Sequence, residues 1–182
     1  MSYYAKLRER ILTIKGVFFL SPREIWFLKT LEDLGYPFEA VKEGLERFFS
    51  YVPPERRPKT PIYFAMKEIE KLKKRISKSS VPVKDWREKF RELVELARTY
   101  LKDLKVEEPR KEEEAELILR QLEKEVYKHL WNILPQEEKK DILKKYKAFK
   151  NDEEVFRLMV KGELKRRFGL KTFSLYVEEY NF

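Results

Sequence analysis

The chain of 182 residues contains no cysteine, and this absence excludes several kinds of chemistry at once. Without thiols there can be no disulfide, no thiolate nucleophile, no cysteine-bound zinc and no cysteine-ligated iron–sulfur cluster. Histidine occurs once, at His129, so the paired Glu-x-x-His motifs of di-iron bundles are missing as well. We therefore expect a surface or capping role for His129, no metal site and no cofactor.

Glycine is also scarce, with five residues, and the sequence has neither of the two common phosphate-cradling loops, G-x-x-x-x-G-K-[ST] and G-x-G-x-x-G. Carboxylates are plentiful, but clustered carboxylates that suit magnesium chemistry are not evident. Glu163 and Lys165 have an E-x-K spacing in a segment predicted to be helical, where residues two apart do not face each other. The sequence predicts that the protein is not an enzyme.

Long apolar runs are missing too, since no stretch approaches the roughly 18 residues of a membrane span. Residues 1–14 carry charges every few positions, unlike a secretory signal. We expect a cytoplasmic protein that does not enter membranes. Asparagine and glutamine together number five, and with abundant Lys and Glu this resembles the composition of proteins from hot environments, so we also expect a thermophilic source.

Charge is what the sequence has in abundance: 40% of the residues are charged, and the net charge is +9. The basic excess is local, with nine basic and three acidic residues in 53–80 and five basic and one acidic in 161–171. By contrast, 107–125 has eight acidic and four basic residues. This asymmetry is compatible with docking of a polyanion on one side. It is equally compatible with the ion-pair network of a thermophilic protein.

Apolar residues recur at spacings of three and four along most of the chain, which predicts an all-α protein of about eight helices. The clearest helix start is Ser21-Pro22-Arg23-Glu24, where Ser21 can cap, Pro22 suits the first turn and Glu24 can complete a capping box. Helix starts are predicted at or near Tyr3, Pro22, Pro37, Pro61 with Thr60 as its cap, Lys84, Arg110, Pro135 and, after Asp152 as cap, Glu153.

The serines and proline of 77–82 break both periodicities and predict a boundary between two helical lobes, 1–78 and 83–182. The second lobe ends in an extended aromatic tail, 170–182, in which Phe173, Leu175 and Val177 alternate as in a strand. Either this tail folds back along its own bundle, or it docks into another subunit or partner protein.

A proline-rich loop and the helix predicted after it carry the larger basic cluster. The basic residues of this helix recur at spacings that place them largely on one side, as a ridge that could follow a phosphate backbone of DNA or RNA. Tyr51 and Tyr63 are candidates for base stacking. With the second cluster included, the candidate nucleic-acid-binding residues are Arg56, Arg57, Lys59, Lys67, Lys71, Lys74, Arg75, Lys78, Lys165, Arg166 and Arg167.

Three features of 21–75 form a further pattern: a helix with Trp26 and Leu31, the stretch LGYPFEAVKEGLERFF at 34–49, and a basic loop leading to KTPIYFAMKEIEKL at 59–72. In these features the segment resembles the helical domain of DnaD-like primosomal proteins of bacterial replication restart. The resemblance implies a DNA-associated, oligomerising accessory protein without catalysis. Leu72 and Lys73 stand where that family tends to have an aromatic residue near the helix end.

Residues 84–182 have no counterpart in that family. With the pattern GLKTFSLY at 169–176, they more closely resemble an uncharacterised bacterial protein family. Taken together, the sequence predicts a non-catalytic, nucleic-acid-associated helical accessory protein that holds a phosphate backbone through its basic loop and helix. The alternative is a protein-interaction or assembly module, which uses apolar helix faces and the tail 170–182.

Overall fold

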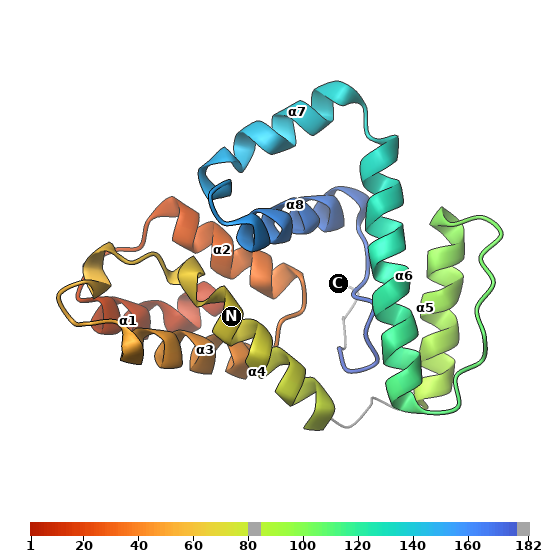
Figure 1. Cartoon of the computed structure of the whole chain (residues 1–182), viewed down its shortest axis with the longest axis horizontal. Coiled ribbons are helices and arrows are strands. Elements are labelled where there is room, and N and C mark those ends of the chain that lie inside the picture. Colours follow the sequence, from red (N-terminus) through yellow and green to blue (C-terminus); the bar gives the residue numbers. More distant parts are fainter. Residues whose placement is uncertain (80–84, 178–182) are drawn as a thin grey trace. The chain divides into compact units, whose positions relative to one another are not determined.

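The computed structural model describes residues 1–79 and 85–177, and within them the chain forms eight α-helices and three 3-10 helices with no strand (Figure 1). The all-α prediction is confirmed. Contacts divide the chain into two compact units, each made of two segments. Unit 1 comprises Met1–Ser79 and Tyr146–Gly162, and unit 2 comprises Ser80–Lys145 and Glu163–Phe182.

Unit 1 is built around a buried apolar core to which every one of its α-helices contributes. Ser2 caps the first helix and Gly16, with φ of 70°, ends it. The capping box predicted at Ser21 and Glu24 is present. The elements of unit 1 are α1 (Tyr3–Lys15), α2 (Pro22–Asp33), α3 (Phe38–Tyr51), η1 (Arg57–Lys59), η2 (Ile62–Ala65), α4 (Met66–Ser79), η3 (Lys147–Phe149) and the first part of α8 (Glu153–Phe168).

Helices α3 and α4 approach each other closely at Gly44. A Cβ atom added at Gly44 would lie 2.6 Å from Cγ1 of Ile69 and 2.9 Å from its Cα. The missing side chain therefore lets the two backbones meet, and this contact commits the inner face of α4 to the core. Ile69 and Leu72 are buried on that face, which leaves the basic residues of α4 on the outside.

The start of α4 differs from the prediction. Thr60 does not cap a helix; its hydroxyl donates a hydrogen bond back to the carbonyl of Arg56 at 2.8 Å. Pro61 has extended backbone dihedrals, and the chain passes through the 3-10 turn η2 before the α-helix begins at Met66. No side chain caps η2, and the α-helix begins several residues later than expected.

Unit 2 contains α5 (Trp86–Tyr100), α6 (Glu112–Ile133), α7 (Gln136–Lys145) and the last residues of α8. Helix α5 ends at the extended residue Leu101, earlier than the predicted Leu104. The following segment, 101–111, runs back along α5, so that α5 and α6 point in the same direction side by side (Figure 1). Leu104 and Val106 of this return segment pack against the buried cluster of α5 and α6, and Glu108 forms an exposed ion pair with Arg91 of α5 at 3.1 Å.

The described part of the tail, 170–177, folds back onto its own unit. Leu170, Phe173 and Leu175 belong to the same buried cluster as the apolar residues of α5 and α6. The alternating pattern does not form a strand: the tail is fixed by Glu116 of α6, whose carboxylate accepts hydrogen bonds from the Ser174 hydroxyl at 2.7 Å and the Leu175 amide at 2.9 Å. Residues 178–182 lie outside the described part.

The two units differ from the two predicted lobes, 1–78 and 83–182, in one respect. Residues 146–162 belong to the same unit as the N-terminal segment. Aromatic contacts explain this. The ring of Tyr146 packs edge-on against Trp26 with centroids 6.0 Å apart, and Phe149 packs against Tyr63 at 5.2 Å. Of the predicted boundary at 77–82, residues 80–82 lie outside the described part. No helix among the described residues is long and apolar enough to cross a membrane.

Candidate nucleic-acid interface

The buried carboxylate of Glu24 positions the basic loop between α3 and α4. Its side chain, 5% exposed like that of Lys15, forms an ion pair with Lys15 at the end of α1. Glu24 also accepts hydrogen bonds from the Ser21 amide at 2.9 Å and from the Ile62 amide, where the loop ends, at 3.2 Å. The capping-box pattern found Glu24, but nothing local in the sequence signals that Lys15 and Ile62 converge on it.

Two opposing effects act on the pKa of Glu24. Burial alone raises it, since a charged carboxylate is poorly solvated inside the protein. The hydrogen bond and charge of Lys15, together with the amides of Ser21 and Ile62, lower it, and they outweigh the burial. Glu24 is therefore ionised in the folded protein and holds α1, α2 and the loop end together as an anion.

The loop itself presents aromatic and basic side chains at the end of α3. Tyr51 is 83% exposed. Arg57 is half-buried, because its Nε donates a hydrogen bond to the Val52 carbonyl at 2.9 Å and so closes the loop. Arg56 and Lys59 are exposed. Tyr51 at the end of α3 and Arg56 and Lys59 in the loop thus lie on the surface, and the loop is fixed at both ends.

Helix α4 continues this basic surface. Lys67, Lys71, Lys74 and Arg75 are exposed, and Lys71 lies 3.2 Å from Glu68 in an ion pair. Glu70, on the same helix, accepts a hydrogen bond from the Tyr36 hydroxyl. The side chain of Lys78 lies outside the described part. We call Arg56, Lys59, Lys67, Lys71, Lys74 and Arg75 the basic ridge.

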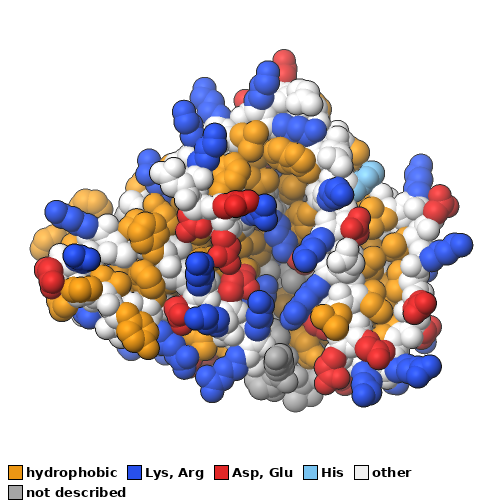
Figure 2. All heavy atoms as spheres, viewed as in Figure 1, with side chains coloured by type: hydrophobic (Ala, Val, Ile, Leu, Met, Phe, Trp, Pro, Cys, Tyr) orange, Lys and Arg blue, Asp and Glu red, His pale blue; other side chains and the backbone are white. Residues whose placement is uncertain are grey.

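Figure 2 shows Lys and Arg side chains over the part of the surface where α4 lies, with acidic side chains among them. Apart from Lys71, the cations of the basic ridge make no side-chain hydrogen bond or ion pair with other described residues. Their charges are therefore available to an external anion.

A cleft of about 930 Å³ opens at the start of α4, wholly within unit 1. It is lined by segments far apart in the sequence: the first turn of α2, the turn η2, and the region from η3 to the start of α8. Its aromatic residues are Tyr63, Phe64 and Phe149. Lys67 lines the cleft and also belongs to the basic ridge, so the two features meet at this residue.

Tyr63, expected to be a stacking residue, forms an inner part of this cleft. Its half-buried ring packs edge-on against Phe27, Phe64 and Phe149, with centroids 6.2, 5.6 and 5.2 Å away. Phe64 is 52% exposed and is the aromatic ring in the cleft that the sequence pattern missed. Helical spacing does not single it out, because η2 is a 3-10 turn and not the first turn of α4.

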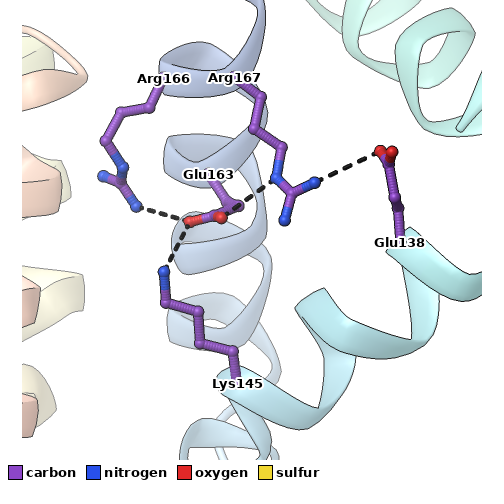
Figure 3. A network of polar contacts seen from close by, with 5 residues as sticks. All are labelled: Glu138, Lys145, Glu163, Arg166 and Arg167. Atoms are coloured by element: carbon purple, nitrogen blue, oxygen red, sulfur yellow. Dashed lines mark hydrogen bonds and ion pairs between the residues drawn. The ribbon is translucent and has the colours of Figure 1, made fainter.

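The candidate residues of the second basic cluster form ion pairs and hydrogen bonds within unit 2. Glu163, only 6% exposed, forms ion pairs with Lys145, Arg166 and Arg167 at 3.3, 3.1 and 3.2 Å (Figure 3). Arg167 also reaches Glu138 of α7 at 3.3 Å. Lys165 is buried and donates to the Thr172 hydroxyl at 2.7 Å. These residues link α7, the end of α8 and the tail.

Metal ligands do not gather anywhere in the described part of the chain: no group of three or more His, Asp or Glu side chains is placed to hold an ion. His129 is half-buried on α6.

Comparison with known proteins gives two matches. A family model described as "Uncharacterised protein" matches residues 2–84. An "Uncharacterized protein" of Aquifex aeolicus (strain VF5) is 38% identical over 173 residues, which cover 94% of this chain and 98% of the relative. No solved structure matches. The DnaD-like resemblance of 21–75 finds no support in these comparisons. The chain therefore belongs to the family of uncharacterised proteins that includes this Aquifex aeolicus relative.

Proposed function

We propose that this protein is a non-catalytic accessory protein that binds the phosphate backbone of DNA or RNA through the basic ridge. The observation that carries the proposal is the row of exposed cations on α4, set over a helix face that is packed into the core. Lys67, Lys71 and Lys74 follow one another at about one helical turn, or about 5 Å along the axis. Such a rigid row suits a linear polyanion better than a compact anion.

The two basic clusters differ in how many of their cations are already paired with carboxylates of the protein. In the basic ridge, every cation except Lys71 would meet a phosphate without giving up an ion pair to a described residue, so counterion release favours binding. In unit 2, Arg166 and Arg167 already form ion pairs with the buried Glu163, and drawing them outward would break two of the ion pairs that stabilise this carboxylate. We therefore place the interface on unit 1 alone.

The assembly alternative relies on apolar helix faces and on the aromatic tail. Phe173 and Leu175 are buried in the core of unit 2, so these side chains are not available to a partner without unfolding the tail. Phe18 and Phe19 of the α1–α2 connection remain exposed, but no groove or matching surface in the described residues indicates what would cover them. Nucleic-acid binding is the better-supported function.

Fluorescence anisotropy with a labelled single strand and a labelled duplex, measured at several salt concentrations, tests the proposal. We expect affinity to fall steeply with salt. The triple variant Arg56→Glu, Lys59→Glu, Lys74→Glu should flatten the slope of log K against log[salt] by about 0.7 for each lost phosphate contact on single strands and about 0.9 on duplex. Absence of binding at low salt would refute the proposal.

A matched control separates the basic ridge from net charge. Lys124, Lys128 and Lys140 are exposed lysines of unit 2, and replacing all three by Glu changes the net charge by the same amount. This variant should keep nearly the original slope. If both triple variants lose affinity equally, the basic ridge is not the binding surface.

A further inference from the structure

We propose that the cleft of unit 1 receives an unpaired nucleobase of the strand held by the basic ridge, and that it favours bases with an exocyclic amino group. This inference rests on the proposed function and specifies the ligand more closely. It follows from three properties of the cleft: its aromatic surface, its charge balance and its supply of hydrogen-bond acceptors.

The aromatic surface supplies a place for a planar ring. Phe64 is half exposed in the cleft, while Tyr63 behind it is held by edge contacts from Phe27 and Phe149. A fixed inner wall with one accessible ring is suited to stacking of a base, and every base offers a π-face. The volume of about 930 Å³ exceeds what one base and its sugar require, so access is not limited by size.

The charge balance of the cleft distinguishes it from the ridge. Arg23, Lys67 and Arg157 bring positive charge, and three carboxylates bring an equal negative charge. One of these carboxylates, Glu153, is paired with Arg157 at 2.5 Å. A phosphate group gains little in such a neutral site, whereas an uncharged base is not repelled. Lys67, at the rim shared with the ridge, is placed to hold the phosphate of the same nucleotide.

Acceptors in the cleft determine which bases fit best. Asp152, Glu153 and Glu154 line one part of the cleft, and ionised carboxylates can only accept hydrogen bonds. Asp152 is partly occupied as the cap of α8, accepting from the Val155 amide at 3.2 Å, while Glu154 makes no hydrogen bond to other described residues. Adenine, cytosine and guanine offer an amino group to such an acceptor, whereas thymine and uracil lack an amino group and can donate only through the ring N3–H.

Oligo-dC and oligo-dT of twelve nucleotides form the sharpest comparison, since both are pyrimidine strands with the same charge and differ at the amino group. Measured by anisotropy at one low salt concentration and neutral pH, oligo-dC should bind about fivefold more tightly or better. Glu154→Ala should reduce the ratio of the two affinities, because the acceptor is lost for oligo-dC alone, whereas the lost negative charge strengthens binding of both strands alike. Phe64→Ala should weaken oligo-dC binding about fivefold or more, and a blunt duplex of equal length should be little affected.

Phe18→Ala is the matched control, because Phe18 is a 93% exposed phenylalanine of the same unit that does not line the cleft. It should leave oligo-dC affinity unchanged; a loss equal to that of Phe64→Ala would move the stacking site out of the cleft and overturn the inference. Equal binding of both oligonucleotides, with binding still abolished by the triple ridge variant, would overturn the inference and leave the proposed function intact. No binding of any strand would overturn both.

Discussion

At the scale of the residue, the buried pair of Glu24 and Lys15 is the most consequential feature of unit 1. Both side chains are almost completely shielded from water, so each charge depends on the other. Replacing Glu24 by Gln removes the negative charge and leaves Lys15 buried without a counterion. We expect Glu24→Gln to lower the free energy of unfolding by about 3 kcal/mol or more, measured by urea denaturation at pH 7.

The same variant has a pH signature. Because the pKa of Glu24 is lower in the folded protein than its ordinary value of 4.5, its contribution to stability is fully present above that value. The contribution is lost as the pH falls through the lower, folded pKa. The difference in stability between the original protein and Glu24→Gln should therefore shrink below pH 4.5.

The double variant Lys15→Met, Glu24→Gln supplies the control, because it removes both charges together. It should be more stable than Glu24→Gln alone, since no unpaired charge stays buried. If the double variant is no more stable, weakening of the hydrogen bonds that the charged carboxylate accepts from the Ser21 and Ile62 amides explains the effect better than the loss of the ion pair.

At the scale of the element, local signals in the sequence were enough to place several helix ends. Ser21 and Glu24 cap α2, Asp152 caps α8 and Gly169 follows its last turn, all through contacts within a few residues. The 3-10 turn at 62–65 could not be predicted in this way. It depends on the Ile62 amide bonding to Glu24, which lies 38 residues earlier in the sequence.

The candidate site, too, could be predicted only where its features depend on local sequence spacing. The spacing of the lysines on α4 correctly placed Lys67, Lys71 and Lys74 on the exposed side. Spacing could not reveal that the cluster around Arg166 is bound to the buried Glu163, or that a cleft forms beside Lys67. Those features arise when segments distant in sequence meet, and a single sequence contains no direct record of such contacts.

The tail element gives a test of its own. Leu175 is fully buried in the core of unit 2, so Leu175→Ala should lower the free energy of unfolding by about 2–5 kcal/mol, measured in urea. Leu117 on α6 is 63% exposed, and Leu117→Ala should change stability by no more than about 0.5 kcal/mol. Equal effects of the two substitutions would mean that the tail is not part of the core in solution.

At the scale of the whole molecule, the chain order and the folded units do not coincide. Residues 146–162 complete unit 1, although the 66 residues 80–145 separate them from its N-terminal segment, which ends at Ser79. The boundary between the units lies inside α8, between Gly162 and Glu163. Val155 and Met159, which precede this boundary, are buried. Glu163, which follows it, forms ion pairs with Lys145, Arg166 and Arg167. The two halves of one helix thus serve different units.

Hydrogen exchange followed by mass spectrometry can test this division, because amides that open together share a common stability. Phe27 is fully buried in unit 1, so Phe27→Ala should accelerate exchange in α2–α4 and in 153–162 while changing 163–175 less. Leu119→Ala, at a fully buried position of unit 2, should do the reverse. If each substitution instead accelerates exchange along the whole of α8 to the same extent, the helix opens as one element and the two units unfold as one cooperative structure.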